Sequence, residues 1–315
     1  MREILDTLER WAAEGVRAVA ATVVKTERSA PRDPGATLAV SETGDVAGSV
    51  TGGCVEPAVY EEAQQVLAGG PPRLLAYGIA DEEAFEVGLP CGGTVHIFLF
   101  QLQHDLVRRL SGAVSEEKPV ALELTVSGPE IGGQRIVALD GRYDPVIDGD
   151  TFVLPFAPRP NMYVFGAIDH AAAVARMGRF LGFHVTVCDA RARFVTPERF
   201  PDVDALVVEW PDRFLREAPI DERTAICVLT HDHKFDIPAL QVALDSPAGY
   251  IGAMGSRRTN DARAERLQAE GVPEEALARI HAPIGLDIGS RTPEEVAVAI
   301  GAQIVATFRK TAVPA

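Results

Sequence analysis

Hydrophobic and polar residues follow two different patterns along the chain. In the first half, the β-branched run 16–26 predicts a buried strand, and 36–50 alternates around the turn-forming triplet Thr43-Gly44-Asp45, which indicates a hairpin. Four more apolar segments predict strands, at 72–79, 94–102, 119–128 and 134–141. Amphipathic segments predict helices over 1–15, 56–68 and 104–114. The first half is therefore predicted to be a mixed α/β domain.

A proline-rich segment separates the two patterns. The stretch LPFAPRPN, residues 154–161, carries three prolines, and proline interrupts both helices and strand ladders. We place the domain boundary here, which gives domains of residues 1–157 and 158–315.

The second half shows short apolar segments that alternate with helical ones. Helices are predicted at 170–183, 256–271 and 290–308, and strands at 162–167, 184–190, 205–210, 225–231 and 248–254. Buried strands separated by helices of this length indicate βαβ units and a parallel sheet covered on both faces. The second domain is predicted to be Rossmann-like, so the whole chain falls in the α/β class.

Charge and composition narrow the function. The 315 residues carry a formal net charge of −15, and no basic stripe reverses it locally, so we expect neither nucleic acid nor an anionic membrane as a partner. The N-terminal segment resembles no signal peptide, and no apolar run is long enough to span a membrane. The expected location is the cytoplasm, where the four cysteines would be free thiols.

One of these cysteines lies directly before a predicted helix. Cys54 follows Gly52 and Gly53, and the helix is expected to begin near Glu56. The unpaired N–H groups at a helix start favour the thiolate, and glycines allow a ligand to approach the backbone. Glu56 is the nearest candidate acid or base.

Cys91 has similar surroundings, because Gly92 and Gly93 follow it before a strand. We predict that Cys54 and Cys91 share a site that meets a substrate or cofactor. The alternative is that both are small residues tolerated in tight turns. Cys188 and Cys227 lie in predicted strands and are expected to be buried apolar side chains.

Four motifs resemble one known family. GSVTGGCVE (48–56), GLPCGGTV (88–95), YIGAMGSRR (250–258) and HAPIGLDIGSRTPEEVAVAI (281–300) are similar, in this order, to the XdhC/CoxI family of xanthine dehydrogenase accessory proteins. The resemblance implies an N-terminal XdhC/CoxI domain and a C-terminal Rossmann domain. Carried onto matching positions, it points to Gly52, Gly53, Cys54, Glu56, Cys91, Gly92 and Gly93.

The function implied by this resemblance is maturation of a molybdenum hydroxylase of the xanthine or CO dehydrogenase type. Such a protein binds the molybdenum cofactor (a molybdopterin), supports its sulfuration and delivers it to the apo-enzyme. It would act as a cofactor-binding chaperone more than as a turnover enzyme. The implied partners are the apo-hydroxylase, a cysteine desulfurase and a second copy of the chain in a homodimer.

The dinucleotide fingerprint of the second domain is incomplete. Gly166 is present, but Ile168 stands where a second glycine would let a pyrophosphate approach, and Asp169 places a carboxylate at the helix start. Asp189, at the end of the next strand, matches the usual ribose-binding acid. This pattern disfavours NAD(P), although an NAD(P)-dependent oxidoreductase remains one rival function, and a scaffold that binds only a protein partner remains another.

Two further polar clusters follow predicted strands. Ser256 and Arg257, at a glycine-rich turn before a helix, form a candidate anion site for the cofactor phosphate. The second cluster has two interpretations, a metal site or a solvated loop that caps the next helix, and consists of His231, Asp232, His233 and Asp236. No zinc spacing of the CxxC type is present, and we assign no metal.

Overall fold

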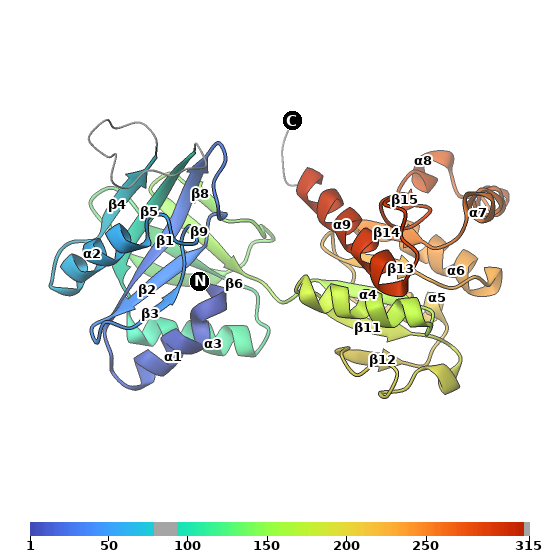
Figure 1. Ribbon diagram of the computed structural model, residues 1–315, viewed down its shortest axis with the longest axis horizontal. Coiled ribbons are helices and arrows are strands. Elements are labelled where there is room, and N and C mark those ends of the chain that lie inside the picture. Colours follow the sequence, from blue (N-terminus) through green and yellow to red (C-terminus); the bar gives the residue numbers. More distant parts are fainter. Residues whose placement is uncertain (79–92, 312–315) are drawn as a thin grey trace. The chain divides into compact units, whose positions relative to one another are not determined.

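A computed structural model describes residues 1–78 and 93–311 of the chain. It divides into two compact units, Met1–Pro158 and Arg159–Ala315, which are described separately (Figure 1).

The first unit is mixed α/β. Its described helices are η1 (Arg2–Ile4), α1 (Leu5–Ala13), α2 (Glu56–Leu67) and α3 (His104–Ser115). Its described strands are β1 (Ala18–Glu27), β2 (Thr37–Ser41), β3 (Val46–Gly48), β4 (Arg73–Tyr77), β5 (Thr94–Gln101), β6 (Val120–Thr125), β7 (Gln134–Ala138), β8 (Val146–Asp148) and β9 (Thr151–Phe156). Within 1–78 and 93–158, these strands form a five-stranded sheet in the order β3-β2-β1-β5-β4 and a four-stranded sheet in the order β7-β6-β9-β8.

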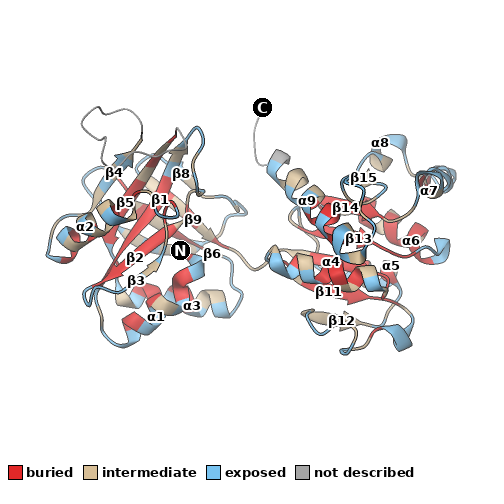
Figure 2. Cartoon of the chain, viewed as in Figure 1, coloured by how far each residue is buried: buried red, intermediate tan, exposed pale blue. Residues whose placement is uncertain are grey.

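Strand β1 contributes to two cores, which explains its nearly continuous apolar run. Val19, Ala21 and Val23 pack with α2 on one face of the five-stranded sheet. Ala18 and Ala20 face the other core, which α1, α3 and the four-stranded sheet complete. Because side chains alternate between the faces of a strand, both sets must be apolar. Figure 2 shows this burial along the strands, with exposed residues on the outer sides of the helices.

The first proline of the proline-rich segment lies inside a strand. Pro155 belongs to β9 and pairs with Ala121 of β6. On its other side β9 pairs with β8 only as far as Val153, so no second ladder is interrupted at Pro155. The strand therefore continues to Phe156 and includes the first three residues of the segment 154–161 in which we placed the domain boundary.

The second unit contains a parallel sheet. Its strands are β10 (Asn161–Phe165), β11 (His184–Cys188), β12 (Ala205–Val207), β13 (Ala225–Val228), β14 (Tyr250–Ala253) and β15 (Ile280–His281). Its helices are α4 (Asp169–Phe180), η2 (Ala192–Phe194), α5 (Pro211–Glu217), α6 (His233–Leu244), α7 (Arg257–Ala269), α8 (Glu274–Leu277) and α9 (Pro293–Thr311).

All described neighbours in this sheet run parallel, in the order β12-β11-β10-β13-β14-β15. Helices α4 and α9 contribute to the core on one face, and α5, α6 and α7 to the core on the other. This arrangement confirms the predicted α/β class and Rossmann-like second domain. The order reverses beside β10, so the loops after β10 and β13 flank the position where open sheets of this type bind ligands.

Candidate functional site

The loop that carries Cys54 connects β3 to α2. Gly52 and Gly53 have φ angles of 88° and 128°, which side-chain-bearing residues rarely adopt, and open space lies beside both α-carbons. Cys54 is a free, half-buried thiol that packs against the core under α2. The loop thus places a partly exposed cysteine between exposed backbone and an apolar core.

Glu56 organises this loop. Its carboxylate accepts hydrogen bonds of 2.6–3.2 Å from the N–H groups of Val50, Thr51, Gly52, Gly53 and Val55 and from the hydroxyls of Ser49 and Thr51. Burial opposes ionisation of the carboxylate, but the hydrogen bonds from Ser49 and Thr51 outweigh it and hold the pKa of Glu56 well below its usual range. Glu56 is therefore ionised at neutral pH.

The backbone N–H groups of this turn already have an acceptor. From the sequence we expected Gly52 and Gly53 to let a ligand approach the backbone, but Glu56 accepts hydrogen bonds from both of their N–H groups. The positive φ angles turn successive N–H groups toward one point, and the carboxylate occupies it. An external phosphate would have to displace Glu56, so its contacts must be sought elsewhere. Exchange of protons by Glu56 with a ligand stays a prediction.

The second cysteine loop lies mostly outside the described residues, which omit Cys91 and Gly92. Gly93 is described, and a Cβ on it would lie 2.1 Å from the Ser29 carbonyl oxygen, so the close approach of two backbones requires glycine there. Strand pairing brings Glu27 opposite Thr94 and Leu38 opposite Gly48. The loops after β1 and β3 and the start of β5 are therefore at one end of the five-stranded sheet.

Because Cys91 lies outside the described residues, the sharing of a site by Cys54 and Cys91 stays a prediction. The loop of residues 28–36, which connects β1 to β2, was not predicted from the sequence to lie near the site. Arg28 there has a φ of 62°, unusual for a residue other than glycine. Arg32 donates to the Ser49 carbonyl oxygen at 3.4 Å and pairs with Glu3 at 2.6 Å. In the sequence, two arginines close to Pro31, Pro34 and Gly35 could have indicated a loop with charged groups here.

In the second unit, Gly166 and Asp189 lie together at the ends of β10 and β11. Gly166 has a φ of 104°, and a Cβ there would lie 2.8 Å from the Thr230 methyl group. The Asp189 carboxylate is buried and accepts hydrogen bonds from the Ala167 N–H and from Arg191. Burial opposes its ionisation, yet the Arg191 guanidinium and the Ala167 N–H lower the pKa of Asp189. The predicted ribose-binding acid thus already has internal partners.

The turn before α7 is a helix cap. The Ser256 hydroxyl accepts a hydrogen bond from the Thr259 N–H, while Arg257 is exposed and lies 4.0 Å from Asp287. An anion at this turn, held by Ser256 and Arg257, stays a prediction.

The His231–Asp236 cluster is divided by the fold. Asp232 caps α6 and pairs with Lys234, but Asp236 is fully buried and pairs with Arg263 of α7 at 2.7 Å. Thr230 and Asn260 complete this internal network through hydrogen bonds to Asp236 and Arg263. Across residues 1–78 and 93–311, no group of three or more His, Cys, Asp and Glu side chains is arranged to hold a metal ion.

The remaining cysteines are internal, as predicted. Cys188 and Cys227 are fully buried, and burial raises the pKa of both thiols to about 12.

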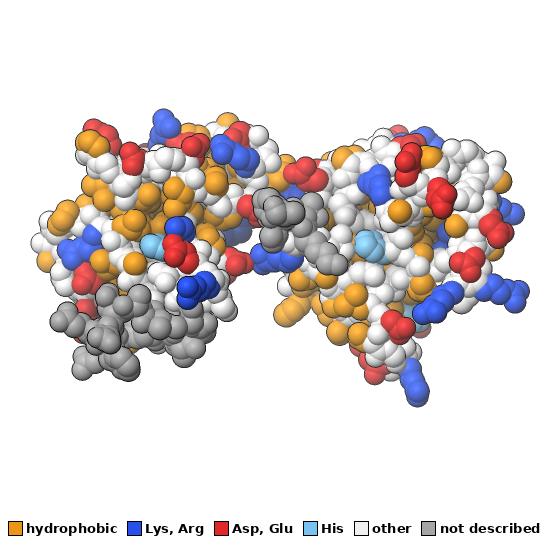
Figure 3. Space-filling model, turned by 90° about the horizontal axis from the view of Figure 1, so that it is seen from above, with side chains coloured by type: hydrophobic (Ala, Val, Ile, Leu, Met, Phe, Trp, Pro, Cys, Tyr) orange, Lys and Arg blue, Asp and Glu red, His pale blue; other side chains and the backbone are white. Residues whose placement is uncertain are grey.

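The surface of each unit carries interspersed acidic and basic side chains on the face shown in Figure 3. No helix in the described part of the chain is both long and apolar enough to cross a membrane.

The chain is thus a two-unit α/β protein with a Rossmann-like second unit. Its first unit carries Cys54 on the loop of residues 49–55, which we call the thiol loop. Comparison with protein families identifies the chain further. The profile of the XdhC and CoxI family matches residues 11–78, and that of the XdhC Rossmann domain matches 162–304. The chain belongs to the XdhC/CoxI family, as its four motifs indicated.

Similar proteins are found over nearly the full length. The chain is 28% identical over 319 residues to a protein of Bacillus subtilis (strain 168) described as a probable xanthine dehydrogenase subunit, with 94% of each protein covered. It is 28% identical over 303 residues to the molybdenum cofactor insertion chaperone PaoD of Escherichia coli (strain K12), covering 95% of this chain and 87% of PaoD. A crystal structure described as a xanthine dehydrogenase from Bacillus halodurans is 25% identical, with a TM-score of 0.75 and coverage of 97% and 96%.

Proposed function

We propose that this protein is a maturation factor that binds the molybdenum cofactor and delivers it to a molybdenum hydroxylase of the xanthine or CO dehydrogenase type. The observation that carries the proposal is the similarity over nearly the whole chain to a cofactor insertion chaperone and to a probable xanthine dehydrogenase subunit. In this role the protein is a carrier in the cytoplasm, without turnover of its own.

The thiol loop fits the soft end of such a cofactor. Cys54 is free and partly accessible, and thiolates are suitable ligands for molybdenum and carriers of sulfur. Gly52 and Gly53 leave space for a ligand beside the backbone. We assign Cys54 to the metal end, together with Cys91, Gly92 and Gly93 from the second loop. Bound cofactor would supply the molybdenum centre that the hydroxylase uses.

Sulfuration and assembly are the finer parts of the proposal. A cysteine desulfurase is the expected sulfur donor, with Cys54 and Cys91 as the protein's receiving thiols. A homodimer is the expected assembly. The anionic end of the cofactor is assigned away from the 49–56 loop, because Glu56 occupies the N–H groups there.

The test is retention of cofactor during purification. Protein from a host that makes molybdopterin should carry pterin, detected by fluorescence of its oxidised product, and molybdenum, detected by mass spectrometry. Protein from a host unable to make it should carry neither. Cys54→Ser and Cys91→Ser should lower retention, whereas Cys227→Ala, which changes a buried thiol in the second unit, should not. Wild type without pterin contradicts the proposed function, and equal retention in all variants contradicts the thiol assignment.

An NAD(P)-dependent oxidoreductase is the second candidate. The strand order around β10 and the place of Asp189 at the end of β11 favour it. The side chain of Ile168, the Asp169 carboxylate at the α4 start and the internal partners of Asp189 oppose it. Titration with NADH and NADPH distinguishes the two, because saturable micromolar binding would support the oxidoreductase.

A further inference from the structure

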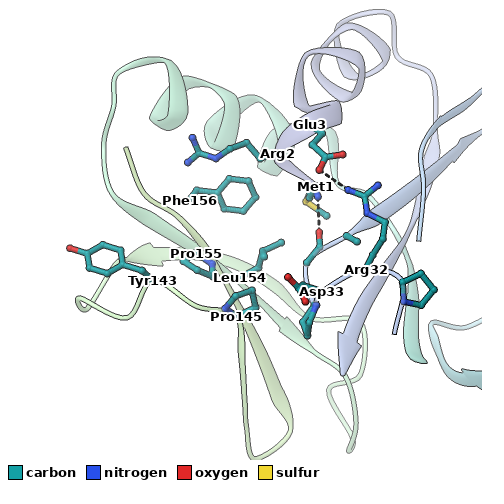
Figure 4. Close-up of a pocket in the computed structure, with 14 residues that line it drawn as sticks. Met1, Arg2, Glu3, Arg32, Asp33, Tyr143, Pro145, Leu154, Pro155 and Phe156 are labelled. Carbon is teal, nitrogen blue, oxygen red and sulfur yellow. Dashed lines mark hydrogen bonds and ion pairs between the residues drawn. The ribbon is translucent and has the colours of Figure 1, made fainter. Parts of the chain in front are cut away.

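A cavity of about 540 Å³ lies in the first unit, beside the loop of residues 28–36 (Figure 4). The arginines of its lining have partners within the chain, because Arg2 donates to the Ala157 carbonyl oxygen and Arg32 pairs with Glu3. In the second unit, by contrast, an apolar surface is exposed on the side of α4 and α9.

Helix α9 has an apolar outer face. Ile300 and Ile304 point into the core of the parallel sheet. Val298 and Val305 are 49% and 43% exposed, and Ala302 is exposed between them. These three positions are separated by four and three residues, so they lie on one face of the helix. The face of α9 that points away from the core is thus apolar over about two turns.

Helix α4 adds an exposed aromatic ring on the same side. The two helices pack against each other on one face of the sheet (Figure 1). Arg176 of α4 pairs with Glu294 of α9 at 3.3 Å, and both side chains are exposed, so this ion pair marks the outer side of the helix pair. Phe180 and Val298 follow these two residues by four positions and therefore share their faces. Phe180, which is 85% exposed, thus lies on the same side as Val298.

The loop that precedes α9 contributes two more apolar side chains. The Leu286 N–H donates to the Ala299 carbonyl oxygen at 3.1 Å, which holds this loop against the helix. Leu286 and Ile288 are both exposed. We call the exposed apolar residues of this side the α9 face, which consists of Phe180, Leu286, Ile288, Val298, Ala302 and Val305. Exposed apolar patches of this kind typically mark interaction surfaces.

The charges at the ends of α9 indicate which partner fits this face. The helix begins with Glu294 and Glu295 and carries the exposed Arg309 near its end. Glu295 and Arg309 each lie seven residues, or about two turns, from Ala302. Reversing the helix about Ala302 therefore exchanges the acidic and basic positions, and it also exchanges the two valines. A second copy of α9, packed antiparallel, is thus complementary to the first in both charge and apolar pattern.

Resting on the homodimer expected in the proposed function, we propose that two copies of this chain associate through the α9 face. The two α9 helices pack antiparallel about a two-fold axis at Ala302, whose small side chain lets the backbones approach closely. Val298 of each copy packs against Val305 of the other, and the remaining residues of the α9 face surround them. Burial of these apolar side chains supplies the affinity, while Glu295 and Arg309 select the antiparallel orientation.

Self-association of the full chain is measured by sedimentation velocity over a range of protein concentrations. Wild type should sediment as a dimer. Ala302→Glu should raise the dissociation constant of the dimer about a hundredfold, because the two-fold axis would bring two carboxylates together in a buried position. Ala262→Glu, the same change at an exposed position in the middle of α7, should leave this constant unchanged.

A cysteine cross-link identifies the surface without a disruptive charge. In a background of Cys54→Ser and Cys91→Ser, two copies of the Ala302→Cys variant should form an intermolecular disulfide under mild oxidation. Antiparallel helices in contact at this residue bring its two α-carbons within the range of about 4–7 Å that a disulfide spans. Ala262→Cys should not cross-link. Cys188 and Cys227 are fully buried and should stay unreactive in both variants.

Each outcome decides one claim. A dimer that Ala302→Glu dissociates and Ala302→Cys cross-links supports the α9 face. This surface is overturned, and the homodimer left in place, by a dimer that persists in Ala302→Glu, dissociates equally in Ala262→Glu, or cross-links no better through Ala302→Cys than through Ala262→Cys. A monomeric wild type overturns both the surface and the homodimer. Cofactor retention by wild type is measured separately, so failure of the α9 face and failure of the carrier function are distinguishable.

Discussion

Replacing Glu56 by glutamine tests whether one carboxylate holds the thiol loop. The glutamine side chain keeps one acceptor oxygen and places an NH2 group where the second oxygen stood. If the retained oxygen takes the place of Oε1, the Gly53 N–H and the Thr51 hydroxyl lose their acceptor, and the Val55 N–H keeps only its longer hydrogen bond of 3.4 Å to the Thr51 hydroxyl oxygen. We therefore expect the variant to be folded but destabilised.

The magnitude follows from the surroundings of these donors. Val55 is fully buried, so the loss of the hydrogen bond from its N–H to Glu56 costs about 1–3 kcal/mol. Gly53 is exposed, and water replaces its lost bond at a cost of about 0.5 kcal/mol. The Thr51 hydroxyl is buried, but it can accept a hydrogen bond from the new NH2 group, so its cost is similar. Together these terms give about 2–4 kcal/mol lower free energy of unfolding for the first unit.

The assay is urea unfolding followed by tryptophan fluorescence. Each unit contains one tryptophan, so a Trp210→Phe background leaves Trp11 to report on the first unit alone. Glu61→Gln, an exposed change on the same helix, is the matched control and should leave the midpoint unchanged. A destabilisation below about 1 kcal/mol for Glu56→Gln would refute the reasoning.

The pH dependence gives a second readout of the same interaction. Because the pKa of Glu56 is lower in the folded state, its stabilisation is complete above the unfolded value of about 4.3 and is lost as the pH falls through the folded value. The difference between wild type and Glu56→Gln should be constant from about pH 6 to 8 and shrink in acid. A difference that grows on acidification would contradict this assignment.

Three further predictions concern other parts of the chain. Asp236→Asn should lower the free energy of unfolding of the second unit by about 3–5 kcal/mol, measured by Trp210 fluorescence in a Trp11→Phe background, because it leaves the buried Arg263 charge unpaired; a change below about 1 kcal/mol would contradict the role of this pair. Gly53→Ala should lower the free energy of unfolding by about 1–2 kcal/mol, because the φ of Gly53 is 128°. Gly112→Ala in α3, the control, should be neutral or stabilising. Equal effects of the two substitutions in urea unfolding would argue against backbone strain at Gly53. In a Cys91→Ser background, a thiol reagent at pH 8 should modify Cys54 in the native state. The same reagent should reach Cys188 and Cys227, whose thiol pKa values are about 12, only after unfolding. Rapid labelling of all three cysteines in the native state would refute the burial of Cys188 and Cys227.

The sequence was sufficient for features that depend on local pattern. The run that forms β1 is apolar because both of its faces are buried, and the hairpin of β2 and β3 has a turn signal between its strands. The buried state of Cys188 and Cys227 followed from the same kind of pattern. The local pattern did not predict short or interrupted strands, such as β15, which has two residues, and β9, which contains Pro155.

The site depended more on distant or three-dimensional partners. Asp236 stands close to histidines in the sequence, but its partner Arg263 comes 27 residues later. No neighbouring residue therefore indicates that the Asp236 side chain points into the core. Glu56 was recognised as a candidate, yet its actual contacts arise because the φ angles of Gly52 and Gly53 bend the backbone around it. The cavity beside Arg32 is lined by segments separated by more than a hundred residues, which no spacing in the sequence indicates.

The self-contained hydrogen bonding of the 49–56 loop has a consequence for a carrier. Since Glu56 supplies the acceptor from within the chain, the shape of the turn does not require a bound ligand. Loading then requires little ordering of the backbone, and unloading leaves no unsatisfied donors behind. For the proposed carrier this is an advantage. Its affinity for the cofactor depends only on direct contacts, so the cofactor can be released without refolding of the loop.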